Sequence, residues 1–254
     1  MSNVIQEKLN GIIFDFESGS REIASKVFSF VREFLNTASN NDWKSELSEY
    51  LQAISSKKKS MAIIKNQTRI LQEMIADAKT MMELNIKLQN FEYEFKSVLN
   101  KIIENARIEI FNEKKLYRII TCSYSSNIRE ILLYFSKNIS IQLFVVKSIF
   151  KNKDVSAKYK TDFANSPIAI RHIEQSEIAL NMNCIDLGMI GADAVIDNNY
   201  VINGTPSLLL AENLLGGNHP FYSIAEKLKF TDDIEIEEGF DKIPIKYITK
   251  IITE

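Results

Sequence analysis

The first 111 residues carry apolar side chains at helical spacing almost throughout. Ser20 is placed to cap one helix, and further helices are predicted to begin near Asp42 and near Ser60. The apolar positions of the helix that follows Ser20 are Ile23, Val27, Val31 and Phe34. The three lysines at 57–59 are interpreted as a solvated helix end, because cations favour helix C-termini.

The longest helix is predicted after residue 80, where apolar residues alternate spacings of four and three. Two apolar residues per heptad also occur in coiled coils, but we interpret this series as the spine of a helical bundle or its junction to the next domain. Its members are Leu84, Leu88, Phe91, Phe95, Val98 and Ile102. Residues 1–111 are therefore predicted to form a helical domain.

After residue 112 the pattern changes to short apolar runs separated by amphipathic stretches. Such runs are typical of buried parallel strands, and the stretches between them of helices that cover a sheet on both faces. Strands are predicted at 116–122, 139–146, 169–173, 185–190 and 220–225. Helices are predicted after a cap at Ser125 or Ser126, over 174–183, and around Leu208 to Leu215, whereas 151–165 is predicted to be a loop. Residues 112–254 are thus predicted to form an α/β domain.

Candidate site residues stand at the carboxyl ends of two of these strands. Thr121 and Cys122 end the strand that starts at Leu116, Ser123 follows it, and Asp193 comes just after the run that ends at Ile190. Open α/β sheets bind ligands at the carboxyl ends of their strands. We therefore expect a site at this edge.

Composition excludes several classes of function. A formal charge of −2 gives no basis for a nucleic-acid surface, and no apolar run is long enough to span a membrane. Two cysteines make no disulfide framework, so a cytoplasmic location is expected. Eight glycines form neither a P-loop nor a GxGxxG motif. The histidines, His172 and His219, lack partners at ligand spacing, so neither a metal nor another cofactor is expected.

Several segments of the second half occur in a recognisable order: Gly191-Ala192-Asp193, a turn at Asn203, Pro220-Phe221-Tyr222, and residues 240–254. With them the chain resembles the family that unites the regulatory alpha, beta and delta subunits of translation initiation factor 2B with two sugar-phosphate isomerases. These isomerases act on methylthioribose-1-phosphate and ribose-1,5-bisphosphate. An archaeal alpha-like subunit is the member it resembles. The resemblance implies a Rossmann-like, doubly wound parallel sheet after the helical domain.

The resemblance also implies where catalysis would occur. The isomerases use a cysteine after the first strand and the aspartate of Gly-Ala-Asp, which is Asp193 here. Ser123 stands at the cysteine position, and Cys122 stands where histidine is usual. A hydroxyl is far less acidic than a thiol, so this exchange disfavours proton transfer. If the chain were an enzyme, its catalytic residues would be Asp193 with Ser123 or Cys122.

Phosphate-binding motifs of the isomerases are altered as well. The segment after the second strand, Val146 to Phe150, has no arginine, and Asn203-Gly204-Thr205 lacks the usual lysine. Near the amino terminus only Ser18-Gly19-Ser20-Arg21 resembles the phosphate loop. A phosphate dianion requires a fixed cation or converging backbone N–H groups. These losses favour a non-catalytic member of the family.

Several residues keep two interpretations. Asp193 is either a ligand-binding carboxylate or a structural one that accepts hydrogen bonds from the amides of Asn203 and Gly204. Lys229 and Lys246 either bind an anion or form salt bridges. Cys122 and Cys184 are both expected to be small buried residues. The residues expected to line a vestigial ligand pocket are Thr121, Ser123, Ser125, Asp193, Asn203 and Lys229.

The function that the resemblance implies is that of a regulatory, binding subunit. Its partners would be a second copy of itself, through the carboxyl-terminal domain, and translation initiation factor 2 or a similar protein. Leu208, Leu209 and Leu215 on one helix face fit such a two-fold interface. A sugar phosphate or nucleotide would be its effector. The alternative is an aldose–ketose isomerase that acts on a ribose phosphate.

Overall fold

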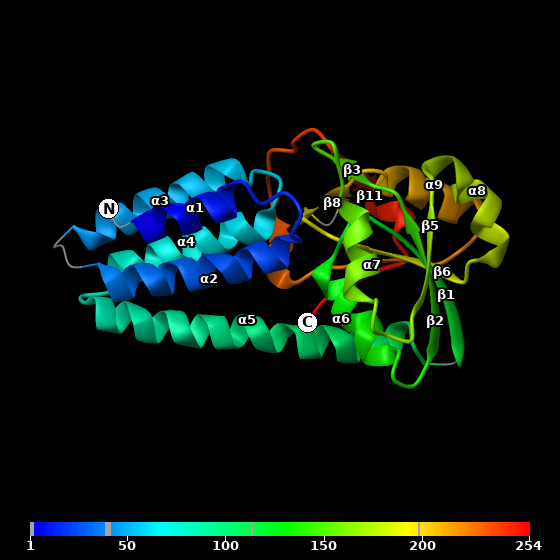
Figure 1. Cartoon of the computed structure of the whole chain (residues 1–254), viewed down its shortest axis with the longest axis horizontal. Coiled ribbons are helices and arrows are strands. Elements are labelled where there is room, and N and C mark those ends of the chain that lie inside the picture. Colours follow the sequence, from blue (N-terminus) through cyan, green and yellow to red (C-terminus); the bar gives the residue numbers. More distant parts are fainter. Residues whose placement is uncertain (1–2, 39–41, 113, 198) are drawn as a thin grey trace.

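The computed structural model describes residues 3–38, 42–112, 114–197 and 199–254. A bundle of helices and an α/β half lie end to end, and the chain crosses between them through one long helix (Figure 1). The bundle consists of α1 (Asn3–Ile13), α2 (Ser20–Thr37), α3 (Trp43–Lys57), α4 (Ala62–Asp77) and most of α5 (Met81–Glu109).

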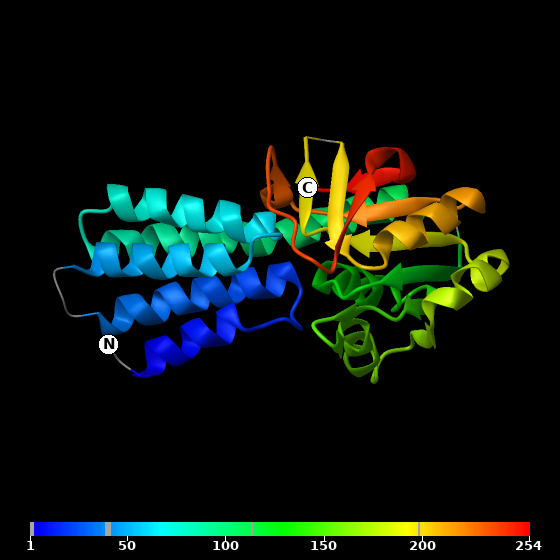
Figure 2. The same ribbon diagram turned by 90° about the horizontal axis from the view of Figure 1, so that it is seen from above.

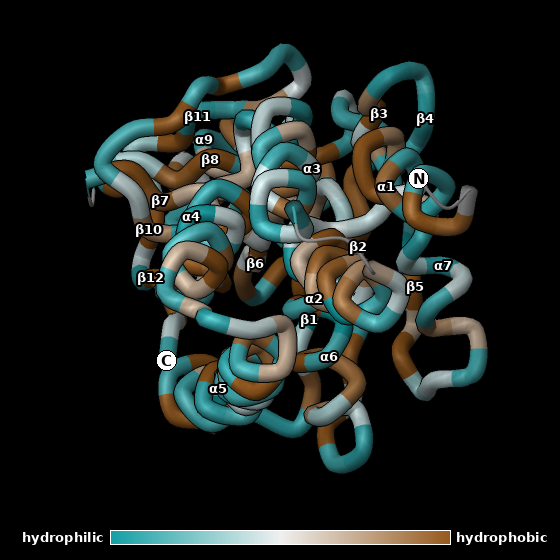
Figure 3. The backbone as a smooth tube through the Cα atoms, turned by 90° about the vertical axis from the view of Figure 1, so that its left-hand side faces the viewer, coloured by the Kyte–Doolittle hydropathy of each residue, from teal (hydrophilic) through white to brown (hydrophobic). Residues whose placement is uncertain are grey.

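Seen end on, the bundle turns its apolar residues inward (Figure 3). The predicted apolar stripe of α2 is buried, and the ring of Phe28 contacts the rings of Phe91 and Phe95 inside the bundle. The N-cap prediction for Ser20 is wrong by one residue. Gly19 occupies the cap and Ser20 begins the helix. Asp42 does stand at the N-cap position of α3, although its side chain makes no capping hydrogen bond.

Helix α5 belongs to both halves. Leu84, Leu88 and Phe95 pack in the bundle, whereas Ile102 and Ala106 pack against the α/β half. The expected boundary near residue 112 falls between α5 and β1, and it remains a prediction, since one continuous helix contributes to the two cores.

The main sheet is parallel, and in the described part of the chain its strand order is β12-β9-β6-β1-β2-β5. This is the doubly wound order, in which the chain starts in the middle of the sheet and builds outward to both edges. The strands are β1 (Leu116–Cys122), β2 (Ser140–Val146), β5 (Ala169–Ile173), β6 (Leu187–Gly191), β9 (Phe221–Ile224) and β12 (Lys250–Ile252). The expected α/β fold is confirmed.

Helices cover both faces of this sheet. One face packs against the end of α5, α6 (Ser126–Phe135) and α7 (Lys158–Asp162). The other face packs against α8 (Ile178–Asn181) and α9 (Ser207–Gly216). The segment 151–165, predicted to be a loop, contains α7 and half of a short hairpin, because Tyr159 and Phe163 are buried and anchor it.

A second, smaller sheet was not predicted. It has the order β10-β7-β8-β11 in the described residues. The hairpin formed by β7 (Ala194–Ile196) and β8 (Tyr200–Gly204) stands out from the main sheet beside the end of the bundle (Figure 2). Strands β10 (Phe230–Thr231) and β11 (Phe240–Pro244) flank it, and a further hairpin joins β3 (Ile149–Phe150) to β4 (Lys153–Asp154).

Candidate functional site

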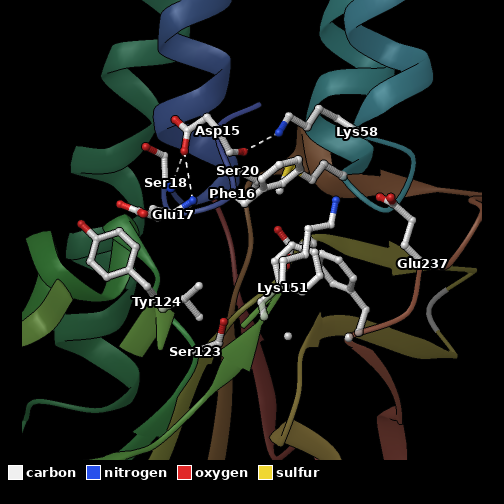
Figure 4. A pocket seen from close by; sticks show the side chains of 18 of the residues that line it. Asp15, Phe16, Glu17, Ser18, Ser20, Lys58, Ser123, Tyr124, Lys151 and Glu237 are labelled. Atoms are coloured by element: carbon white, nitrogen blue, oxygen red, sulfur yellow. Dashed lines mark hydrogen bonds between the residues drawn. The ribbon is translucent and has the colours of Figure 1, made fainter. Parts of the chain in front are cut away.

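A cleft opens where the bundle meets the carboxyl ends of β1 and β6 (Figure 4). These two strands are neighbours at the point where the strand order reverses, which is where open α/β sheets bind ligands. The cleft contains about 660 Å³ of space, part of it open to solvent. One wall is the edge of the sheet, with Ser123, Asp193 and Gly204, and the other comes from the bundle, with residues 15–20 and Lys58.

Ser123 begins the cleft wall immediately after β1. Its backbone has the left-handed φ of 57°, and its N–H donates to Ser148 Oγ at 2.6 Å. A Cβ on Gly204 would lie 2.6 Å from Ser123 Oγ, so glycine is needed for this close approach. Ser123, which the resemblance places at the isomerases' cysteine position, therefore faces the cleft.

Cys122 points the other way. Its side chain is 1% exposed, and its Sγ lies 3.2 Å from Ser207 Oγ on α9. Burial raises the pKa of this thiol to about 12. The other cysteine, Cys184, is exposed rather than buried, which corrects the prediction, because the strand expected to enclose it begins only at Leu187. Neither thiol lines the cleft.

Asp193 follows β6 at the floor of the cleft. Its carbonyl oxygen accepts from the N–H of Ala62, which ties the sheet edge to the start of α4 at 2.9 Å. Burial raises the pKa of its carboxyl to about 6, and the charge of Lys229 and the hydroxyl of Ser20 only partly offset this rise. The amide side chain of Asn203 donates instead to Ser207 Oγ, at 2.8 Å.

A buried cluster of charges joins the two walls behind Asp193. Arg21 of α2 forms an ion pair with Glu226 at 2.8 Å, and Lys229 approaches the same carboxylate at 3.0 Å. Arg21 also donates to the carbonyl oxygen of Phe95. Burial alone would raise the pKa of Glu226, but the charges of Lys229 and Arg21 outweigh it and lower that pKa to about 2. Of its two interpretations, Lys229 thus forms the salt bridge, which is buried.

Helix N-termini converge on the same place. Gly19 and Ser20 start α2, and Ser125 and Ser126 start α6, and all four line a small recess that also includes Asp193, Asn203 and Lys229. Gly19 has no side chain to cap α2, so its first N–H groups face the recess uncapped. Backbone N–H groups at a helix N-terminus attract anions.

Most of the predicted pocket residues thus lie together, but Thr121 does not. It is fully buried within β1 and is absent from the lining of the cleft and the recess. The side chain of Ser125 caps α6 by accepting from the N–H of Ile128 at 3.4 Å, which settles the choice between Ser125 and Ser126.

Lys58 was missed. Its side chain is 3% exposed and lines the cleft, so the interpretation of residues 57–59 as a solvated helix end is wrong for this residue. Lys57 ends α3 and Lys58 is its C-cap residue, so the helix-end part of that interpretation holds, and no local signal set Lys58 apart from the exposed lysines on either side of it. Lys151, at the turn of the β3–β4 hairpin, reaches the same cleft from the opposite side (Figure 4).

A model of the initiation factor 2 subunit family matches residues 17–239. The chain belongs to this family. A Pyrococcus furiosus protein described as translation initiation factor eIF-2B subunit 2-like is 32% identical over 155 residues, which are 54% of this chain and 55% of that protein. The chain thus spans about half the length of the curated relatives it matches.

Solved structures share the fold over nearly the whole chain. The structure of the translation initiation factor eIF-2B of Pyrococcus horikoshii matches this chain with a TM-score of 0.85 at 19% sequence identity. The match covers 100% of this chain and 96% of that protein's chain. A 5-methylthioribose 1-phosphate isomerase from the same organism has a TM-score of 0.77 at 13% identity, with 98% of this chain and 82% of its own covered. These structures establish a fold that both branches of the family use.

The described residues contain no cluster of three or more histidine, cysteine and acidic residues that could hold a metal ion. No helix among them is long and apolar enough to cross a membrane.

Proposed function

We propose that this family member is a non-catalytic, initiation factor 2B-like regulatory subunit that binds a phosphorylated small molecule and assembles with other proteins in the cytoplasm. One observation carries the proposal. Ser123 lines the cleft where the resemblance places the catalytic thiol, and the neighbouring Cys122 is buried against α9 with a pKa of about 12. A site without an ionisable thiol keeps the shape of the isomerase site and loses its proton transfer.

The recess supports binding of a phosphate group. Uncapped N–H groups of α2 and the N-terminus of α6 face it, and the ammonium group of Lys229 lies at its edge. These groups replace the arginines that the sequence lacks as a source of positive potential. A sugar phosphate or nucleoside monophosphate would place its phosphate there and extend into the larger cleft.

Assembly is supported by the outer face of α9. Leu209 is 39% exposed and Leu215 is 55% exposed, whereas Leu208, which was expected on the same face, is partly buried against the core. Exposed leucines on one helix fit the self-complementary surface of a two-fold dimer. A solved relative from Chaetomium thermophilum is a tetrameric eIF2B-beta2-delta2 complex, with a TM-score of 0.75. Translation initiation factor 2 is the proposed further partner.

Calorimetry with ribose 5-phosphate and adenosine monophosphate tests the effector pocket. We expect binding that Asp193→Ala weakens at least tenfold, with no turnover of either ligand. Light scattering tests assembly: Leu215→Glu should convert a dimer into a monomer, whereas Asp193→Ala should leave the dimer intact. No binding of any phosphate, or a monomeric wild type, would count against the corresponding half of the proposal.

An isomerase acting on a ribose phosphate is the second candidate, and Asp193 favours it. A carboxyl with a pKa of about 6 is suited to exchange protons near neutral pH. Incubation with ribose-1,5-bisphosphate, followed by ³¹P NMR, decides the matter. Turnover that disappears in Asp193→Asn would replace the regulatory assignment with a catalytic one.

A further inference from the structure

Lys58 has an unusual environment for a lysine. It lies in the connection between α3 and α4, almost fully buried, and its Nζ donates to the carbonyl oxygen of Asp15. The ring centre of Phe16 is 4.7 Å from this Nζ. Among the described residues, no carboxylate lies within ion-pair distance of Lys58. The ammonium form has therefore lost its water and gained only a neutral acceptor and an aromatic face, which together do not replace hydration.

A second cation raises the cost of the charged form. The Nζ of Lys151 lies 3.6 Å from the centre of the same Phe16 ring. Lys151 stands at the turn of the β3–β4 hairpin with a φ of 46°, and the ring of Phe150 beside it is also close to its Nζ, at 5.4 Å. Two ammonium groups that share one ring repel each other, and the repulsion is relieved when one of them loses its proton.

The other charged groups around Lys58 act in both directions, and the largest of their effects on its pKa, that of Asp15, favours the ammonium form. Asp15 and Glu237 favour the ammonium form, and Lys26 and Lys151 oppose it. The carboxylate of Asp15 is already engaged by Lys26 and by the N–H groups of Glu17 and Ser18. Burial is the largest cause, and it lowers the pKa of Lys58 to about 8.

We propose that Lys58 is a nucleophilic amine that forms a reversible imine with an aldehyde bound in the cleft. The amine adds to the carbonyl carbon, a C–N bond forms, and one water leaves as the C=N bond is made, so no oxidant or reductant is needed. The protonated imine keeps one N–H, which can still donate to the carbonyl oxygen of Asp15. Lysines activated by burial and by a neighbouring cation are known to act in this way.

The proposal deepens the proposed function by naming a ligand class. Lys58 lines the same cleft as Asp193 and Ser123, so the open-chain aldehyde form of an aldose phosphate would meet both the phosphate-binding recess and the amine. An imine would hold such an effector far longer than hydrogen bonds alone. The amine itself, however, requires no phosphate in its partner, which allows the two ideas to be tested separately.

Trapping with glycolaldehyde and cyanoborohydride tests the amine directly. The full chain is treated briefly at pH 7.5 with a limiting amount of glycolaldehyde, and the modified lysines are located by peptide mass spectrometry. Lys57 and Lys59 flank Lys58, are both exposed, and serve as internal controls. With a pKa of about 8, Lys58 is roughly one quarter neutral at this pH, against about one in a thousand for an ordinary lysine. We expect Lys58 to react at least tenfold faster than either neighbour.

The pH profile and one pair of variants test whether burial and the neighbouring cation cause the reactivity of Lys58. The rate at Lys58 should reach half its maximum near pH 8, whereas Lys59, whose pKa is raised by its hydrogen bond to Glu235, should react only at higher pH. Lys151→Ala should move the Lys58 midpoint upward and slow its modification at pH 7.5. Lys153→Ala, in the same hairpin but paired with Glu17 at the surface, should leave it unchanged. Labelling of Lys57 and Lys59 ahead of Lys58, or equal effects of the two variants, would overturn the proposal.

Failure of this experiment and failure of the effector pocket give different results. Glycolaldehyde carries no phosphate, so selective labelling of Lys58 supports the amine even where calorimetry finds no binding of ribose 5-phosphate. Phosphate binding that is lost in Asp193→Ala, without selective labelling of Lys58, supports the pocket and removes the covalent step.

Discussion

The two walls of the cleft differ in how far their residues could be recognised from sequence motifs. The sheet wall keeps the fold of its family and places Ser123 and Asp193 at the ends of adjacent parallel strands. The bundle wall supplies the N-terminus of α2 and two buried cations, Arg21 at the recess and Lys58 in the cleft, of which only Arg21 lies in a segment that resembles a family motif. Sequence motifs therefore located most of the sheet wall, whereas the burial of Lys58 in the bundle wall became visible only in the folded chain.

The charged cluster that joins the walls gives the largest expected effect. Glu226→Ala should lower the free energy of unfolding by about 3–5 kcal/mol, because Arg21 and Lys229 are left buried without their carboxylate. Urea unfolding measures this loss of stability. The matched control is Glu235→Ala, which removes an exposed ion pair with Lys59 between the same two halves and should have no measurable effect. Equal losses in both variants would contradict the importance of burial.

The raised pKa of Asp193 predicts how the stability of the folded chain changes with pH. Its folded pKa of about 6 lies above the unfolded value near 3.9, so the folded chain binds the extra proton between pH 4 and 6. Stability should therefore fall as pH rises through this window, by on the order of 2 kcal/mol. The effect is absent in Asp193→Asn. Glu226, with its lowered pKa, acts only below about pH 4.5, where stability falls with decreasing pH. Thermal unfolding across pH 3–8 separates the contribution of Asp193 from that of Glu226.

Two glycines that face the α6 N-terminus sharpen the comparison. A Cβ on Gly191, in the sheet wall, would lie 2.8 Å from Ser125 Cβ, whereas one on Gly19, in the bundle wall, would lie 3.4 Å from the N atom of Ser126. Gly191→Ala should therefore cost roughly 1–3 kcal/mol through overpacking, and Gly19→Ala only a few tenths. Comparable losses in chemical denaturation would show that the bundle wall is packed as tightly as the sheet edge.

The smallest expected effect concerns the cap of α6. Ser125→Ala removes the acceptor for the N–H of Ile128 and should lower stability by about 1 kcal/mol. Ser126→Ala, one residue later and already helical, should change stability less. Thermal melts of the two variants are sufficient, and an equal shift in melting temperature would remove the assigned capping role.

Local patterns predicted the elements well and the contacts between them poorly. The run from Leu116 to Cys122 became β1 with the same ends, because its apolar residues are covered on both faces of the parallel sheet and only Arg118 is exposed. The β7–β8 hairpin was missed, since Ala194 to Ile196 is only three residues long and directly follows the Gly-Ala-Asp motif.

The site was predicted in the same uneven way. Ser123, Asp193 and Asn203 stand in motifs, and the order of parallel strands brings them to one edge. Arg21 and Glu226 are separated by 205 positions, so nothing local connects them. Lys58 has neighbours of its own type in sequence and is distinguished only by burial, which depends on how α3 and α4 meet the sheet.

The shared helix α5 has a consequence for synthesis on the ribosome. The part of α5 near Asn105 must wait for its partners, because the side chain of Asn105 donates to the carbonyl oxygen of Thr253, 148 positions later. Ile102 and Ala106 likewise pack against strands and helices translated after them. The bundle can close around the first turns of α5 early, while its far end stays an uncovered apolar surface during elongation. That surface is where a nascent-chain chaperone would be expected to bind.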